Sequence, residues 1–208
     1  MFITFEGIDY SGKSTQIKKI IDYFEQNNIK YCLVREPGGT IISEKIREIL
    51  LDKQFNNIFP ETELLLFSSA RAQLVREVIK PKLSEGYIVL GDRFFDSTFA
   101  YQGYGHGLSL KYIEKITNFA TDNLKPDLTF IFDIPLEVAK ERANLNKRAK
   151  DRIENFDEKF FYKVRNGYIK ISNTDKRYKI IDATEPIDEI FKKIIEIILQ
   201  NQKKWKSQ

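Results

Sequence analysis

The sequence contains a single cysteine, Cys32, and a single histidine, His106. One cysteine cannot form a disulfide within the chain, and so low a cysteine content is typical of proteins from reducing compartments. The two residues are also too few for a zinc site built from cysteine and histidine ligands. The sequence therefore favours neither a disulfide scaffold nor a zinc module.

Long apolar runs are also absent. No stretch approaches the roughly 20 apolar residues that a helix needs to cross a bilayer. The N-terminal segment Met1–Glu6 reaches a carboxylate too early to act as a signal peptide. We therefore expect a cytoplasmic protein without a membrane partner.

Charge of one sign is not concentrated along the chain as a whole. Its 34 basic and 30 acidic side chains give a net charge of +4, whereas nucleic-acid binders carry a basic stripe. The excess is local, because six basic residues lie close together in the stretch 140–152. They are Lys140, Arg142, Lys147, Arg148, Lys150 and Arg152. Such a cluster suits a polyphosphate, and we expect no nucleic-acid partner.

Short apolar runs alternate with segments of helical spacing over 208 residues, a length that fits one domain, 1–208. The predicted strands are Phe2–Glu6, Tyr31–Arg35, Tyr87–Gly91, Leu128–Asp133 and Tyr178–Asp182, all apolar on both faces. The predicted helices are Ser14–Asn27, Ile42–Asp52, Glu61–Ser84, Ser109–Thr121, Leu136–Arg142, Asn155–Ser172 and Ile187–Gln202. This order predicts an α/β fold in which helices flank both faces of a five-stranded parallel sheet. Ligands of such a fold gather at the carboxyl ends of the strands.

A phosphate-binding motif follows the first predicted strand. Residues 7–14, GIDYSGKS, fit the pattern G-x-x-x-x-G-K-[ST] between a strand and a helix, which is the context that the motif requires. Its backbone N–H groups and the following helix N-terminus can bind phosphate oxygens. Lys13 adds a positive charge, and the Ser14 hydroxyl can ligate Mg²⁺. The candidate ATP-binding residues here are Gly7, Ile8, Asp9, Tyr10, Ser11, Gly12, Lys13, Ser14 and Thr15.

The motif alone does not separate a kinase from a switch GTPase or a motor ATPase. A switch GTPase normally carries an Asn-Lys-x-Asp segment to read guanine, and none lies in the appropriate later strand region. A small-molecule kinase needs a second anion site and a cationic cover that excludes water.

Four segments could supply that second site. Asp92 and Arg93 follow the third strand, where Arg93 could hold an acceptor phosphate and Asp92 could orient Mg²⁺ or hold Arg93. Residues 35–40, REPGGT, form a sterically open turn. Phe67 and Arg71 share a helix face, so a ring could stack on a base while Arg71 donates to its carbonyl. The basic stretch could close over the phosphates. Each segment also has a purely structural reading: an ion pair, a loop, a core aromatic or a solvated face.

Together, these segments resemble the thymidylate kinases of bacterial type, which have a P-loop kinase fold. The likeness runs from Phe2 to the final helix through FEGIDYSGKST, REPGGT, LLFSSAR, DRFFDSTFAYQG, PDLTFIFD, DRIE and IDAT. It implies a homodimer that uses ATP and Mg²⁺ to phosphorylate dTMP to dTDP, on the way to dTTP. It also implies a lid at about 143–153 that supplies catalytic cations.

The resemblance implies roles for individual residues. Asp9 would bind the 3′-hydroxyl of the sugar, Phe67 would stack on thymine, and Arg71 would bind its O4 atom. Tyr101 would disfavour a ribose. Pro37 would border the 5-methyl group, and Arg47 and Arg93 would hold the phosphate. Thr98 and Gln102 would contact the base edge, and Ser97 would be a further substrate contact. Arg142 and Ala183 would border the bound ATP.

Two positions depart from the family pattern. Some members carry an arginine inside the phosphate loop, where this chain has Tyr10, so the cationic charge must come from the lid. Its candidates are Lys147, Arg148 and Arg152, and the lid is slightly longer than the bacterial pattern. Phe94 replaces the tyrosine or histidine that usually follows the Asp-Arg pair, so any hydrogen bond made there is lost.

Three functions stay open at this point besides dTMP phosphorylation. The chain could be a kinase for another nucleoside monophosphate or a deoxynucleoside, a non-catalytic nucleotide-binding module, or a nucleic-acid binder. For the kinase reading we expect direct in-line transfer, in which Lys13, Asp92, Arg93, Arg148 and Arg152 assist by position and charge.

Overall fold

Five parallel strands form the centre of the fold. The computed structural model describes residues 1–145 and 151–206. Its strands are β1 (Phe2–Glu6), β2 (Tyr31–Arg35), β3 (Ile88–Asp92), β4 (Leu128–Asp133) and β5 (Tyr178–Asp182), in the order β2-β3-β1-β4-β5. The predicted α/β fold and its five strands are confirmed, with β3 displaced by one residue.

Burial decreases from the centre of the sheet to its edges. Every residue of β1 is buried, whereas Leu33 of β2 is 46% exposed and Ile180 of β5 is 50% exposed. Side chains of β1 alternate between two apolar clusters, Phe2 facing one and Ile3 and Phe5 the other. The prediction of strands buried on both faces therefore holds for the inner strands and fails at the two edges.

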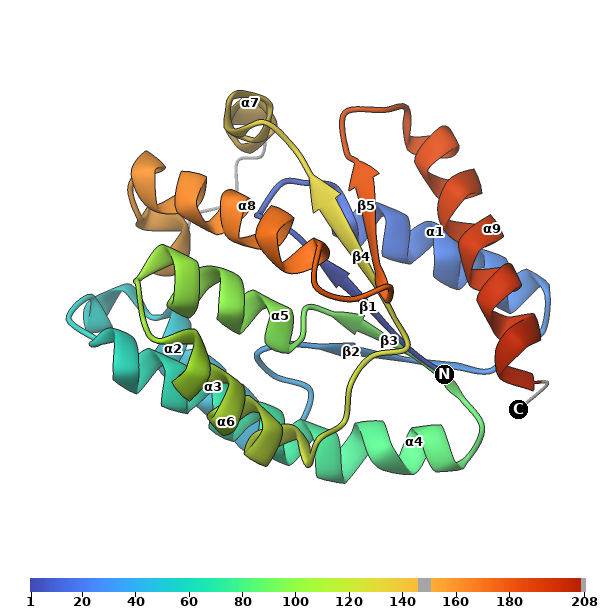
Figure 1. Cartoon of the computed structure of the whole chain (residues 1–208), viewed down its shortest axis with the longest axis horizontal. Coiled ribbons are helices and arrows are strands. Elements are labelled where there is room, and N and C mark those ends of the chain that lie inside the picture. The colour runs from blue at the N-terminus through green and yellow to red at the C-terminus, as the bar shows by residue number, and fades with distance from the viewer. Residues whose placement is uncertain (146–150, 207–208) are drawn as a thin grey trace.

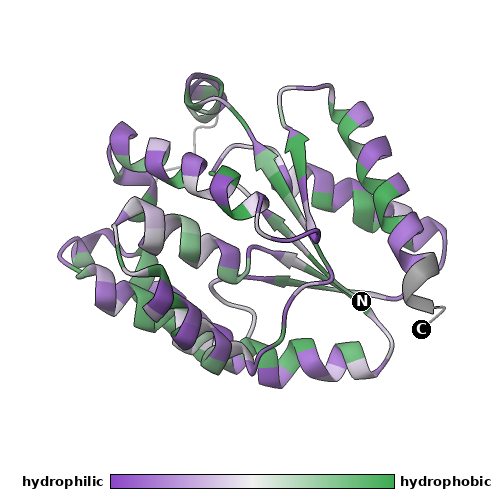
Figure 2. Ribbon diagram, in the orientation of Figure 1, coloured by the Kyte–Doolittle hydropathy of each residue, from purple (hydrophilic) through white to green (hydrophobic). Residues whose placement is uncertain are grey.

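Helices cover both faces of the sheet (Figure 1). Helices α1 and α9 pack together on one side, and α5, α8 and the α3–α4 run lie on the other. In Figure 2 the strands are mainly hydrophobic and the helices alternate between hydrophobic and hydrophilic faces, as expected of helices packed against a buried sheet. The helices are α1 (Lys13–Gln26), α2 (Ile41–Leu51), α3 (Pro60–Leu74), α4 (Lys80–Ser84), α5 (Phe95–Thr98), α6 (Leu110–Thr121), α7 (Leu136–Leu145), α8 (Glu158–Ser172) and α9 (Ile187–Lys206).

The long helix predicted over Glu61–Ser84 contains a π-helical turn, η2 (Val75–Ile79). Within it, the Lys80 N–H donates to the Val75 carbonyl, five residues earlier. Pro81 follows directly, and a proline has no N–H to continue the α-helical pattern. The wider turn accommodates this missing donor and lets the chain continue as α4.

A second π-helical segment, η3 (Phe99–Gly105), extends α5, and the sequence reasoning predicted no helix there. Two glycines allow η3 and α8 to approach closely. A Cβ atom at Gly105 would lie 2.6 Å from the Phe160 ring, and one at Gly167 would lie 2.7 Å from the Tyr104 ring. Two short 3₁₀ turns, η1 (Lys53–Phe55) and η4 (Ile153–Asn155), were also not predicted from the sequence.

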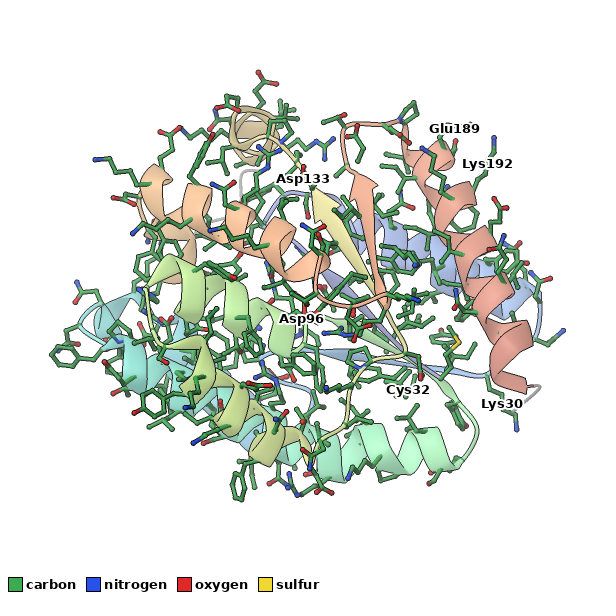
Figure 3. All side chains as sticks on the ribbon, viewed as in Figure 1. Lys30, Cys32, Asp96, Asp133, Glu189 and Lys192 are labelled. Atoms are coloured by element: carbon green, nitrogen blue, oxygen red, sulfur yellow. The ribbon has the colours of Figure 1, made fainter. Side chains whose placement is uncertain are left out.

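Two buried or half-buried carboxylates fix α5 and α8 to the sheet. Asp133, which Figure 3 labels at the end of β4, accepts two hydrogen bonds from Arg165 of α8, at 2.7 and 2.9 Å. Asp96 of α5 is fully buried and pairs with Arg177, which immediately precedes β5. Because both anchors are charge-assisted, they hold the helices that border the carboxyl edge of the sheet in defined positions.

Candidate active site

A cavity of about 690 Å³ opens at the carboxyl edge of the sheet. It lies where the strand order reverses around β1, the position at which open parallel sheets bind ligands. Most of the predicted site residues line it: Asp9, Tyr10, Ser11, Gly12, Lys13, Ser14, Thr15, Pro37, Arg47, Phe67, Arg71, Asp92, Arg93, Ser97, Thr98, Tyr101, Gln102, Arg142 and Ala183. Gly7 and Ile8 lie beneath, where their carbonyls accept hydrogen bonds from Lys13.

The phosphate loop needs both of its glycines. Gly7 has φ of 135°, and a Cβ atom there would meet the Phe132 carbonyl at 2.6 Å. Gly12 has φ of 91° and precedes α1 without a side-chain cap. Among the described residues, the first N–H groups of α1 therefore have no capping side chain, which leaves them directed at the cavity. The loop fits the phosphate group that its sequence predicts.

Lys13 lies across this loop. Its Nζ donates to the carbonyls of Gly7 and Ile8 at 3.0 and 2.9 Å and to the Ser11 hydroxyl at 3.3 Å. Burial, followed by the positive charge of Arg93, lowers the pKa of Lys13 to about 8. A phosphate anion in the loop would oppose both effects and keep the ammonium group charged.

The oxygen ligands near the loop fit a magnesium ion that is held mainly by phosphates. Ser14 and Asp92 both line the cavity. No cluster of three histidine, cysteine, aspartate or glutamate side chains suitable for a metal occurs within the described residues. Mg²⁺ usually takes one or two protein oxygens together with water and substrate phosphates, so this sparse donor set is compatible with it.

Arg93 contacts both the phosphate loop and Tyr101. One of its Nη atoms donates to the Gly7 carbonyl at 2.8 Å and the other to the Asp9 carboxylate at 2.7 Å. The guanidinium also lies 5.3 Å from the centre of the Tyr101 ring. Burial opposes its charge, but Tyr101, Asp9 and neighbouring acidic groups hold the pKa of Arg93 well above its usual range. Its φ of 69° is uncommon for a side-chain-bearing residue and is typical of functional sites.

Arg71 and Phe67 of α3 also line the cavity. Arg71 is 1% exposed, and its Nε and Nη2 atoms bind the Glu36 carboxylate at 2.8 and 2.6 Å. Its Nη1 atom is buried and has no hydrogen-bond partner among the described residues. A buried unpaired donor is costly, so this atom indicates a ligand acceptor.

The buried Tyr101 hydroxyl forms no hydrogen bond of regular geometry with a described residue, although it interacts with the Arg93 guanidinium. Burial raises the pKa of Tyr101 well above the usual value, so the hydroxyl is neutral and can donate. Phe94, which follows the Asp92–Arg93 pair, is 1% exposed and packs edge-on against Phe2, with ring centres 4.9 Å apart. An apolar contact thus occupies the position where the family pattern has a polar side chain.

Sequence reasoning missed Glu6, the last residue of β1. Its carboxyl group accepts hydrogen bonds from the Phe94 N–H at 2.7 Å, the Ser97 hydroxyl at 2.6 Å and the Tyr168 hydroxyl at 2.9 Å. Burial, then the nearby Asp96, raises the pKa of Glu6 to about 7. These contacts tie β1 to the turn that carries Arg93. A charged residue at the end of a mainly apolar strand is the signal that could have revealed it.

The lid residues differ in their placement. Arg142 of α7 donates to the carbonyls of Ala183 and Tyr10, at 2.8 and 3.4 Å, and so joins the phosphate loop to the turn after β5. Lys147, Arg148 and Lys150 belong to the segment 146–150, outside the described residues. Arg152 does not line the cavity. Its guanidinium is buried against Glu63 and donates to the Leu50 carbonyl at 2.7 Å, so these two contacts hold the side chain in the protein interior.

None of the described helices has the length and apolar content that a membrane span requires.

Comparisons with known proteins show the family of the chain. The sequence model of the thymidylate kinase family matches residues 5–194. A thymidylate kinase from Thermosipho africanus is 49% identical over 198 residues, which cover 95% of this chain and 97% of the relative. One from Kosmotoga olearia is 46% identical over 205 residues, or 98% of each chain. The crystal structure of thymidylate kinase from Ehrlichia chaffeensis matches with a TM-score of 0.76 at 33% identity, over 95% of this chain and 98% of the other.

The family match covers most of the chain, and the phosphate loop, Arg93 and Arg71 all line one cavity. The chain belongs to the thymidylate kinase family, whose reaction is the Mg²⁺-dependent transfer of a phosphoryl group from ATP to dTMP, yielding dTDP for dTTP synthesis.

Proposed function

We propose that the two ends of the cavity bind the two substrates of this reaction, with ATP phosphates on the Gly7–Thr15 loop and dTMP between Arg93 and Arg71. The observation that carries the proposal is the continuity of one cavity from Lys13 to Phe67. Arg93 lies between the ends, in contact with Gly7 and Asp9 of the loop and with the Tyr101 ring. Two phosphates bound on either side of one guanidinium would be brought into line for direct transfer.

At the donor end, Lys13 would leave the Gly7 and Ile8 carbonyls and bind the β- and γ-phosphates. Ser14 would hold Mg²⁺ directly and Asp92 through water, and the ion neutralises charge on the transferring group. Arg142 and Ala183 would border adenine, since Arg142 already donates to Ala183 beside the loop. No strong general base is needed because the acceptor phosphate is already ionised near neutral pH. Catalysis would come from position and positive charge.

At the acceptor end, Phe67 would stack on thymine while the unpaired Nη1 of Arg71 donates to O4. Thr98 and Gln102 would contact the base edge, and Pro37 would border the 5-methyl group. Around the sugar and phosphate, Asp9 would bind the 3′-hydroxyl, Tyr101 would exclude a 2′-hydroxyl, and Arg47, Arg93 and Ser97 would hold the phosphate.

Of the lid residues, Arg148 remains our candidate for the cation at the transferring group. For Arg152 the contacts support a different role. Its buried pairing with Glu63 and its bond to Leu50 join the DRIE segment to α2 and α3. We propose that Arg152 acts by positioning these elements rather than by touching phosphate.

A coupled assay of ADP release with purified protein tests the proposed acceptor. ATP consumption should depend on dTMP and exceed that with dUMP, dCMP, dGMP or thymidine. Preference for another of these acceptors would assign a different nucleotide kinase. ATP binding without dTMP-dependent consumption would support a non-catalytic module. A nucleic-acid binder would instead show affinity for DNA or RNA that falls steeply with salt.

We also propose that the protein is a homodimer. Helices α2, α3 and α6 pack side by side (Figure 1) and expose large apolar side chains. These include Ile41 at 85%, Ile42 at 54%, Leu65 at 55%, Tyr112 at 67% and Phe119 at 82% exposed. Exposed apolar groups on neighbouring elements are typical of protein interfaces. Sedimentation should give a dimer mass for the wild type and a monomer for Leu65→Glu, and a monomeric wild type would contradict the proposal.

We propose a cytoplasmic location for the same enzyme. The single cysteine is compatible with a reducing compartment. Fractionation of the source cells should recover dTMP kinase activity with the cytoplasm, and recovery in another fraction would contradict this.

A further inference from the structure

Glu63 of α3 binds three side chains from distant parts of the chain. It is 1% exposed and does not line the cavity. Its Oε1 atom accepts a hydrogen bond from Gln102 Nε2 at 2.8 Å and contacts His106 Nε2 at 3.2 Å. Its Oε2 atom pairs with Arg152. Among these described partners Gln102 lines the cavity, so Glu63 is linked to the substrate site through Gln102.

The Glu63 side chain is ionised. Burial alone would raise its pKa, but the hydrogen bonds from His106, Arg152 and Gln102 outweigh burial and hold the pKa of Glu63 below its ordinary value. An ionised carboxylate has only acceptor atoms. It can therefore bind the amide nitrogen of Gln102 but repels the amide oxygen.

This contact fixes the orientation of the Gln102 amide. With Nε2 held by Glu63, the remaining polar atom, Oε1, is the one available to the cavity. Rotating the amide by half a turn would place Oε1 against the Glu63 carboxylate and lose a buried, charge-assisted hydrogen bond. Gln102 thus presents an acceptor, whereas Arg71, which lines the same cavity, has an unpaired donor in Nη1.

Such a pair of groups distinguishes pyrimidine bases. Thymine and uracil carry a donor at N3 and an acceptor at position 4, which complement an amide oxygen and a guanidinium. Cytosine carries the reverse, an acceptor at N3 and a donor amine at position 4. A site built to hydrogen-bond one pattern leaves buried groups unpaired when it meets the other.

We propose that Glu63 is a specificity-determining residue, which orients the Gln102 amide so that the site accepts a base with a protonated N3 and rejects cytosine. The inference rests on the proposed binding of the base between Phe67, Arg71 and Gln102. Glu63 acts through Gln102 and does not touch the substrate.

The substitution Glu63→Gln tests this directly. Arg152 has only donors, so it should draw the oxygen of the new amide and turn the new NH₂ group towards Gln102. Gln102 then has to reverse, and its Nε2 faces the base. The ratio of kcat/KM for dTMP to that for dCMP should fall by about tenfold or more. The ratio of dTMP to dUMP should not change, because these bases share N3–H and O4.

Two further variants separate the possible causes. His106→Asn is the matched control, because it alters the other partner of Oε1 and leaves the Gln102 contact in place, so both ratios should stay at the wild-type values. Gln102→Leu should lower the ratio of kcat/KM for dTMP to that for dCMP, independently of the role of Glu63. If Gln102→Leu leaves that ratio unchanged, the proposed placement of the base fails. If it lowers the ratio but a folded Glu63→Gln variant does not, only the role of Glu63 fails.

A structural role alone would lower turnover of dTMP, dUMP and dCMP equally, and this result would also overturn the proposal. If Glu63→Gln does not fold, the double variant Glu63→Gln with Arg152→Met removes the buried charges together and avoids an unpaired guanidinium. The Gln102 amide is then free to adopt both orientations, so the ratio of dTMP to dCMP should again fall. A ratio within about twofold of the wild type would contradict the inference.

Discussion

Replacing Arg71 by methionine should separate the contribution of the Arg71–Glu36 ion pair to stability from that of Arg71 to substrate binding. The two side chains are 1% and 4% exposed, with Nη2 and Oε2 2.6 Å apart. Methionine fills part of the volume but leaves the Glu36 carboxylate buried without its partner. Removing one partner of such a pair costs about 3–5 kcal/mol of unfolding free energy. Burial already raises the pKa of Glu36, and loss of the guanidinium would raise it further.

Adding Glu36→Gln to this variant removes the stranded charge, so most of the lost stability should return. Binding of dTMP should stay weaker than in the wild type by about tenfold or more in both variants, because the donor Nη1 is gone. Urea denaturation measures the stability, and calorimetric titration with dTMP measures the affinity. A loss below about 1 kcal/mol in Arg71→Met would refute the energetic reasoning. Normal dTMP affinity in the double variant would refute the role of Nη1.

Three other substitutions test the donor end and the support of Arg93. Lys13→Met should lower kcat by about a hundredfold or more, while circular dichroism shows an intact fold. Near-normal turnover would contradict a catalytic role of Lys13. Arg93→Ala should also lower kcat/KM for dTMP by about a hundredfold. Steady-state assays across dTMP concentrations measure this value. An unchanged kcat/KM would contradict the role of Arg93 in the acceptor site. The pKa of Glu6 is raised from 4.5 to about 7. Because the folded protein binds this proton more tightly than the unfolded chain, the stabilisation is complete below pH 4.5 and is lost as the pH rises through 7. Relative to Glu6→Gln, the wild type should lose about 3 kcal/mol of unfolding free energy between pH 4.5 and 7. Denaturation at several pH values measures this loss. Parallel curves of unfolding free energy against pH for the two proteins would contradict the pKa shift.

Much of the fold was predictable because local and global signals agree. The apolar runs of β1 and β4 are buried in the sheet, and the glycines of the phosphate loop sit between a strand and a helix as the motif requires. Phe67 and Arg71 recur at helical spacing and do line one cavity. Where the sequence pattern depends on neighbours along the chain, it predicts the structure well.

The remainder depends on contacts between distant residues. The π-helical segment Phe99–Gly105 is stabilised against α8 by close approach at Gly105, which the local sequence does not encode. Glu63 meets partners 39, 43 and 89 residues away, so its role is visible only in three dimensions. Arg152 belongs to a basic stretch typical of a lid, yet a buried carboxylate holds it away from the cavity. Glu63 does share the spacing of four with Phe67 and Arg71, and a carboxylate on that face is the signal that could have revealed it.

The central claim is that one cavity holds both the ATP phosphates and dTMP. Single-turnover transfer from ATP labelled at the γ-phosphate tests it most directly. Purified protein with Mg²⁺ should convert dTMP to labelled dTDP, with no labelled protein formed and with transfer suppressed by Arg93→Ala. Labelled protein as an obligatory intermediate, or no labelled dTDP at saturating dTMP, would contradict direct transfer across this cavity.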